Sequence, residues 1–350
     1  MFLATLVFWL GRRRFVHVPP KPGGKRGLLD TVSSLALFMT FGHLFFTAGR
    51  PWPELLVYSF VFLIAGLALF AYRQRLSPDD GFLAVTLYAV KRLFLGSTND
   101  RGSDENEGSG ESSQETVALA RSRFWGAAVR RFGVAATEGP IAVLKIISIL
   151  LFISVFWALF DQHASSWIEQ ARLMDLSFLG GQVLPNEIQA LNPLLVMVLI
   201  PLLNVVYFGC DRLGIRTPPL GRMTVGMVLT AFSFVAAALI QARIDALGSG
   251  QVWFVWQVVP YVLLTIGEVM VSVTALEFAY TQAPKRMKST IMSFLNLTVT
   301  LGNVLVALLA YFAGLKLVNF FWVFAGLMAA AAVLFGIRSL FYVQKDYPQE

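Results

Sequence analysis

Long apolar stretches separated by short polar segments make up most of the chain. A helix that crosses a bilayer needs about 20 mainly apolar residues. Eight stretches approach this length, although the first two are short: Thr31–Ala48, Glu54–Tyr72, Ile141–Asp161, Ala190–Cys210, Arg222–Ala242, Trp256–Tyr280, Thr290–Leu315 and Leu317–Tyr342. An additional apolar segment, Met1–Leu10, spans only about 15 Å as a helix and looks like the end of a longer one. The pattern predicts an all-α integral membrane protein.

The composition agrees with this prediction and excludes several other classes. Only 14% of the 350 residues are charged and 56% are hydrophobic, whereas soluble domains are about 25% charged. Cys210 is the single cysteine and the three histidines are far apart in sequence, so we expect no disulfide, no metal site and no cofactor. An intramembrane aspartyl protease needs two facing aspartates, but Asp161 has no second one in a span, and no intramembrane Ser–His set is present. We therefore expect no enzyme.

Basic residues collect on one side of the expected spans. That side receives clusters beginning at Arg12, Arg73, Lys91, Arg121, Arg212 and Lys285, and then Arg338 and Lys345. The opposite side receives only Arg50, Arg172, Arg243 and Lys316. Cytoplasmic loops carry such an excess of Lys and Arg. The distribution predicts a multi-pass protein of the cell (inner) membrane, with the N-terminus as given and the C-terminus on the cytoplasmic side. The net charge of +7 could attract nucleic acid or a lipid bilayer, and the positions of the basic residues favour the bilayer.

The cytoplasmic segments differ in composition. We expect a basic loop over residues 12–30, a long segment over 76–137 and a short tail over 343–350. The centre of the long segment, 96–116, is rich in Gly, Ser and acidic residues and predicts a disordered linker, because it cannot bury enough apolar surface to fold. Amphipathic stretches flank this linker, and we expect them at the lipid surface; binding of a partner protein is the alternative.

Glu268 is the most informative residue because it lies within the apolar run Val252–Ala279. A carboxylate near the bilayer centre costs several kcal/mol unless it lines a polar cavity, finds a partner or takes up a proton. We interpret Glu268 as a ligand or proton site; the alternative is a permanently protonated acid bonded inside the bundle. Ser272 shares its face at helical spacing. Gly267 allows either a close helix approach or a local distortion.

Other polar residues in the spans allow two interpretations each. Glu277 lies nine positions beyond Glu268, about half a circle away on a straight helix. We interpret it as one member of a structural or gating ion pair with Lys285 or Arg286. Asp161, at the outer end of its span, either faces headgroups and water or has a functional role. Trp157, one turn earlier, lines either a cavity or an aromatic belt.

Several separate motifs follow one another along the spans: Phe156–Gln162 (FWALFDQ), Leu191–Pro193 (LNP), Gly267–Glu268 followed by Ser272, Leu276–Pro284 (LEFAYTQAP) and Thr298–Asn303. In this order they resemble signatures of the proton-dependent oligopeptide transporter (POT) family of the major facilitator superfamily. The resemblance implies two six-helix bundles around a central peptide site, with two extra helices between them in bacterial members. Residues 1–11 are then the end of the sixth helix, 31–75 the extra pair and 138–342 the C-terminal bundle.

The resemblance also implies roles for individual residues. Glu268 is expected to bind the peptide amino group, with Asn192, Trp157 and Ser272 on the substrate-binding wall. Asp161 is expected to belong to the proton-coupled gate, to which Glu268 and Glu277 also contribute. The implied activity is proton-coupled symport of di- and tripeptides, without a cofactor.

The chain departs from the family pattern in several places. The first five helices are missing, and with them the acidic proton-coupling motif and the cationic half of the site. Leu295 stands where many members have tryptophan, Asn296 where they have an apolar residue, and Asn204 where aspartate is expected. Three explanations stay open: a transporter that lost its N-terminal half through a misplaced start or a frameshift, a half-transporter with a separately encoded N-terminal partner, or a non-transporting remnant. Alone, this polypeptide is not expected to transport.

Overall fold

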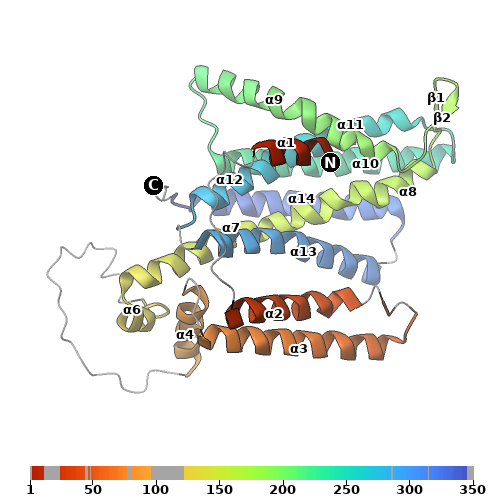
Figure 1. The fold of residues 1–350 in the computed structure, drawn as a ribbon. Coiled ribbons are helices and arrows are strands. Elements are labelled where there is room, and N and C mark those ends of the chain that lie inside the picture. Colours follow the sequence, from red (N-terminus) through yellow and green to blue (C-terminus); the bar gives the residue numbers. More distant parts are fainter. Residues whose placement is uncertain are drawn as a thin grey trace. The chain divides into compact units, whose positions relative to one another are not determined.

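The computed structural model describes residues 2–11, 24–43, 46–47, 49–76, 81–95, 122–284, 287–313 and 315–344. These residues are helical apart from one short hairpin and the connecting loops (Figure 1). The expected acidic linker, 96–116, lies outside them, as does most of the expected basic loop. The chain forms two units, Met1–Ala84 and Val85–Glu350, which are described separately.

The first unit contains α1 (Phe2–Gly11), α2 (Gly24–Gly42) and α3 (Trp52–Leu76). The start of α2 lies seven residues before the expected Thr31, so its first turns occupy part of the expected loop. An ion pair between Asp30 of α2 and Arg73 of α3, whose side chain is only 8% exposed, holds these early turns against α3. Because α2 also ends early, its apolar part, Gly27–Gly42, is too short to count among the candidate spans.

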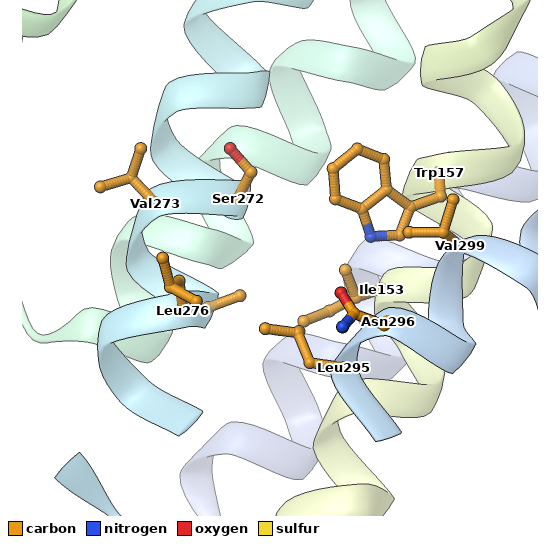
Figure 2. A pocket seen from close by; sticks show the side chains of 9 residues that line it. Ile153, Trp157, Ser272, Val273, Leu276, Leu295, Asn296 and Val299 are labelled. Carbon is orange, nitrogen blue, oxygen red and sulfur yellow. The ribbon is translucent and has the colours of Figure 1, made fainter. Parts of the chain in front are cut away.

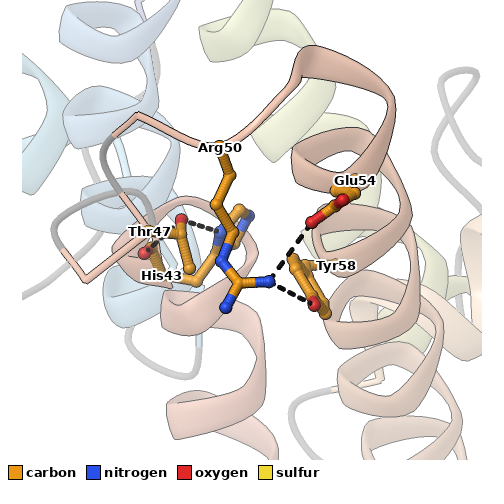
Figure 3. A network of polar contacts seen from close by, with 5 residues as sticks. All are labelled: His43, Thr47, Arg50, Glu54 and Tyr58. Carbon is orange, nitrogen blue, oxygen red and sulfur yellow. Dashed lines mark hydrogen bonds and ion pairs between the residues drawn. The ribbon is translucent and has the colours of Figure 1, made fainter.

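A polar network fixes the connection between α2 and α3 (Figure 3). The ring of His43 is buried, with Nδ1 3.2 Å from the Thr47 hydroxyl and Nε2 2.8 Å from the Ser59 hydroxyl of α3. Arg50 pairs with Glu54 in the first turn of α3 at 3.2 Å. These contacts anchor both ends of the connection to α3.

The second unit carries six of the seven helical segments that are long and apolar enough to cross a membrane in the described part of the chain. The elements follow in the order α4 (Phe82–Leu95, which begins at the unit boundary), α6 (Gly126–Phe132), α7 (Val134–Phe160), η3 (Asp161–Ala164), α8 (Ser166–Arg172), η4 (Ile188–Ala190), α9 (Leu191–Arg212), α10 (Pro219–Leu247), η5 (Phe254–Gln257), α11 (Val258–Glu268), η6 (Val269–Val273), α12 (Thr274–Thr281), α13 (Lys288–Ala313) and α14 (Leu317–Leu340). Two antiparallel strands, β1 (Ser177–Phe178) and β2 (Gly181–Gln182), form a hairpin between α8 and η4. Apart from this hairpin, the chain is an all-helical membrane protein, and its described residues contain seven candidate spans where eight were expected.

Three tight helix pairs organise the core of the second unit. Helix α10 packs against α14, α7 packs against α13, and α10 also packs against α11. Aromatic rings fill the space between the first pair: Phe234 of α10 stacks on Phe324 of α14 with ring centroids 6.0 Å apart, and both are fully buried. At the second pair, a Cβ on Gly302 of α13 would lie 2.6 Å from the carbonyl oxygen of Ser154 in α7, so only glycine permits this approach.

Three glutamines tie the start of α11 to its neighbours. Gln257 of η5 donates to the side-chain oxygen of Gln170 in α8, and Gln170 donates to that of Gln241 in α10, each at 3.1 Å. All three side chains are buried, and Gln241 in turn donates to Asp245 at 2.8 Å. A buried amide network of this kind restricts the geometry of the elements it joins, so the position of α11 is set from its first turn.

Gly267 produces the closest helix approach near the centre of α11. A Cβ on Gly267 would lie 2.3 Å from the Thr230 hydroxyl and 2.8 Å from the Gly226 carbonyl of α10. Two residues later the α-helix gives way to the π-helical segment Val269–Val273, before α12 continues it. Both sequence interpretations of Gly267, close packing and a local distortion, therefore apply to this part of the chain. Short π segments occur often at functional sites.

Replacing Gly267 with alanine should destabilise the protein because the added methyl group overlaps the backbone of α10. Such overpacking typically costs about 1–3 kcal/mol. We expect a lower midpoint of thermal or denaturant unfolding for Gly267→Ala in detergent. Gly326→Ala is the matched control: nothing lies within 4 Å of its added Cβ, so this helix-favouring change should leave stability equal or higher. Equal stability of the two variants would contradict the close approach.

Candidate functional site

The centre of the site is a contact between the side chains of Glu268 and Asn192. Asn192 lies in the first turn of α9, and Glu268 is the last residue of α11. The Asn192 Nδ2 donates to Glu268 Oε2 at 2.7 Å and to the hydroxyl of Thr265, one turn earlier on α11, at 3.2 Å. Asn192 is 8% exposed and Thr265 is fully buried. One amide therefore joins two helices and fixes the carboxylate.

The Glu268 carboxylate has a hydrogen-bond donor but no positive partner. Throughout the described ranges, no Lys, Arg or His side chain forms an ion pair with it, and the Asn192 amide is neutral. A buried charge is costly unless it is paired as well as hydrogen-bonded. The site is therefore suited to accept a cation or a proton from outside this set of helices.

Ser272 connects this contact to a neighbouring pocket. Its hydroxyl lies in the π-helical segment and donates to the backbone carbonyl of Glu268 at 2.8 Å. The same residue lines the pocket described next. In this structure Ser272 thus supports the backbone at Glu268 rather than the carboxylate, and a serine that bonds back in this way often bends its helix.

The pocket lies between α7, the π-helical segment with α12, and α13 (Figure 2). Its volume is about 240 Å³, and its lining residues are mostly apolar: Ile153, Trp157, Ser272, Val273, Ala275, Leu276, Leu295, Asn296 and Val299. The Nε1 of Trp157 is buried and has no hydrogen-bond partner among the described residues. Figure 2 shows this nitrogen on the side of the ring that faces Ile153 and Asn296. The Trp157 donor, the Asn296 amide and Ser272 are therefore the polar groups of a largely apolar lining.

In the described part of the chain, no side-chain hydrogen bond or ion pair joins the two other predicted acids to Glu268 or Asn192. Asp161 follows the last turn of α7, where its backbone N–H donates to the carbonyl of Trp157, and its side chain is half-buried. Glu277 is exposed on α12. Neither carboxylate forms an ion pair with a residue that the structure describes, and the expected partners of Glu277, Lys285 and Arg286, lie outside those residues.

The sequence estimate of the angle between Glu268 and Glu277 assumed a straight α-helix. The π-helical segment Val269–Val273 lies between the two residues. Since a π-helix has more residues per turn than an α-helix, the count at 100° per residue does not hold, and the half-circle separation is not a sound geometric argument. Sequence reasoning also missed Thr265, although its position three residues before Glu268 on an α-helix indicated a shared face.

Comparisons with known proteins agree on one family. Residues 112–323 match the family model described as PTR2, the POT family. Peptide transporter 3 of Caenorhabditis elegans is 39% identical over 109 residues, covering 31% of this chain and 15% of that protein. Peptide transporter PTR2 of Saccharomyces cerevisiae is 28% identical over 197 residues, covering 53% of this chain and 32% of that protein.

Solved structures of the same kind cover nearly the whole chain. An auto-inhibited POT family peptide transporter is 29% identical with a TM-score of 0.61, and the match covers 100% of this chain and 64% of that one. The POT family transporter PepTSo is 33% identical with a TM-score of 0.56, over 97% of this chain and 63% of that one. The chain therefore spans less than two thirds of the length of these transporters.

A double-mutant cycle tests the contact between Asn192 and Glu268. Hydrogen bonds to charged groups contribute about 1.5–3 kcal/mol, so Asn192→Ala and Glu268→Ala should show a coupling of this size in unfolding free energy. The control cycle pairs Asn192→Ala with Glu277→Ala. Since Glu277 is exposed and shares no hydrogen bond with Asn192, its effects should add within about 0.5 kcal/mol. Equal coupling in both cycles would show that the contact does not form.

Proposed function

Because the chain belongs to the POT family, we propose that its second unit forms one wall of a site for proton-coupled transport of di- and tripeptides, with Glu268 binding the peptide amino group. The family membership supports peptides as the class of substrate, since the relatives described above are peptide transporters. The role of each residue rests on the geometry of the second unit.

The observation that carries the proposal is that Asn192 donates to Glu268 while no basic side chain among the described residues pairs with this carboxylate. The amide fixes one carboxylate oxygen, Oε2, at 2.7 Å and leaves acceptor capacity on the carboxylate, since each ionised acid accepts about four hydrogen bonds. A peptide ammonium brings three donors and the missing positive charge. A proton satisfies the same carboxylate when the peptide leaves, so one group can alternate between peptide and proton.

We assign proton coupling to Asp161 together with Glu268, and we assign gating to Glu277. Two features support this part of the proposal: the Asp161 carboxylate has no ion-pair partner in the described part of the chain, and it directly follows the helix that carries Trp157. A rocking transport cycle requires a second bundle against which the first can move. That bundle, within a longer chain or in a separate partner, would supply the cation for the peptide carboxylate.

The neighbouring pocket is assigned to a side chain of the peptide. Its volume of about 240 Å³ and largely apolar lining suit an uncharged side chain. The Trp157 Nε1, which has no hydrogen-bond partner among the described residues, and the Asn296 amide add hydrogen-bonding capacity. This favours side chains that carry a neutral polar group, such as glutamine, over aliphatic ones of similar size. Leu295 lines the pocket where the family resemblance led us to expect a larger tryptophan, which leaves more room for such side chains.

We expect Glu268→Gln to abolish most proton-driven uptake of Ala-Ala into proteoliposomes, when this sequence forms the C-terminal part of a two-bundle transporter. Loss of a charge-assisted contact of about 1.5–3 kcal/mol corresponds to a roughly 10- to 150-fold decrease. N-acetyl-Ala-Ala serves as the control substrate. It lacks the ammonium group, so it should be taken up poorly by both proteins and to the same extent. Undiminished Ala-Ala uptake by the variant would exclude the assigned role.

The pocket assignment predicts a change in selectivity for Asn296→Leu. Loss of one neutral hydrogen bond, about 0.5–1.5 kcal/mol, should lower the uptake of Ala-Gln relative to Ala-Leu roughly 2- to 10-fold in a competition assay. The matched control is Val299→Leu, which changes the volume of the same pocket without removing a polar group and should affect both peptides alike. An unchanged ratio for Asn296→Leu would place the peptide side chain elsewhere.

A further inference from the structure

A small helical cluster lies outside the candidate spans of the second unit. Its buried centre consists of Val85 and Ala89 from α4 and Ala128 from α6. Partly buried aromatic side chains surround this centre: Tyr88, Phe124, Trp125 and Phe132. The two helices thus hold each other through side-chain packing, although a long segment of sequence separates them.

Arginines reinforce this cluster at the ring of Tyr88. The guanidinium of Arg131 lies 4.5 Å from the centroid of that ring and that of Arg92 5.5 Å. Arg92 Nε also donates to the Tyr88 hydroxyl at 3.1 Å. The hydrogen bond from Arg92, with smaller contributions from Arg131, lowers the pKa of the Tyr88 hydroxyl. The surface around α4 and α6 is therefore strongly basic.

The opposite face of α4 is apolar and uncovered in the described residues. Leu87 is 62% exposed and Phe94 is 81% exposed, and with the half-buried Val90 they form a stripe at spacings of three and four residues. Lys91 is exposed at the border of this stripe. A soluble surface helix does not normally present aligned large apolar side chains next to a basic one, because such a face gains stability only when it is covered.

Chain connectivity keeps the cluster at the membrane surface. Only Gly133 separates the end of α6 from the start of α7, a candidate span. Helix α4 packs on α6 within the cluster and is therefore held at the same level. An amphipathic helix at that level that combines large apolar residues with Lys and Arg is typical of helices lying in the headgroup region.

We propose that the stripe of Leu87, Val90 and Phe94 is inserted into the bilayer surface and that Lys91 and Arg130 bind the headgroups of anionic lipids. Arg130 is exposed in the last turn of α6, next to the start of α7. Basic residues at this level attract anionic lipids, and the attraction ends within a Debye length of the surface. The cluster would thereby anchor both ends of the connecting segment at one leaflet.

The single cysteine makes a direct test possible. In a Cys210→Ser background, Leu87→Cys is labelled with an environment-sensitive fluorophore, and the full chain is reconstituted into phosphatidylcholine vesicles with or without phosphatidylglycerol. The control label is placed at Gln182→Cys, an exposed polar position in the β-hairpin. For the label at Leu87→Cys we expect blue-shifted emission, and quenching by lipids that carry a spin label near the headgroup. Both effects should be much weaker for the control label.

The anionic preference is measured by carrying the quencher on phosphatidylglycerol or on phosphatidylcholine in equal amount. We expect quenching by labelled phosphatidylglycerol to be at least twice as strong as quenching by labelled phosphatidylcholine. The double substitution Lys91→Gln with Arg130→Gln should reduce the ratio of the two to near one and leave the blue shift unchanged. Water-like emission at Leu87→Cys in every vesicle would overturn insertion and would leave the stripe to a protein partner. Equal quenching by both lipids in the protein that retains Lys91 and Arg130 would overturn the headgroup preference.

Discussion

A carboxylate within an apolar span, held by a neutral amide, is the constraint on which the site depends. The Asn192 amide gives Glu268 a hydrogen bond without giving it a counter-charge. A basic partner in place of Asn192 would neutralise the acid permanently and compete with any cationic guest. An apolar partner would leave the acid without a donor and raise the cost of keeping it charged. The observed pair holds the carboxylate in place and leaves it able to bind a cation or a proton.

The backbone around Glu268 is built to hold this geometry. Gly267 brings α11 against Gly226 and Thr230 of α10, and the buried glutamines fix the start of α11. The π-helical segment that begins after Glu268 also packs against α10 and contains Ser272, which lines the pocket. Glu268 therefore lies between a closely packed turn and a local irregularity of the helix, and tight packing of the supporting elements holds a ligand group in a fixed geometry.

The membrane class could be predicted from the sequence, because apolar length is a local signal. An isolated acid in an apolar run is also a local signal, and it marked Glu268 as a candidate before its surroundings were known. The pairing of Glu268 with Asn192, 76 residues away, could not be derived from periodicity, and only the family motifs grouped the two residues. The π-helical segment carries no clear local signal, so the angle assigned to Glu277 was unsound. The start of α2 was placed too late because the ion pair of Asp30 with Arg73 stabilises turns that are not themselves apolar.

The most direct test of the central claim locates the peptide amino end in the bound state. A dipeptide with a photoreactive diazirine on its first residue is bound to the two-bundle transporter that contains this sequence, irradiated, and the adducts are mapped by mass spectrometry. We expect adducts on the peptides of α9 and α11 that carry Asn192 and Glu268, and we expect these adducts to disappear in competition with unlabelled Ala-Ala. Adducts confined to other helices, with Glu268 unmodified, would contradict the central claim.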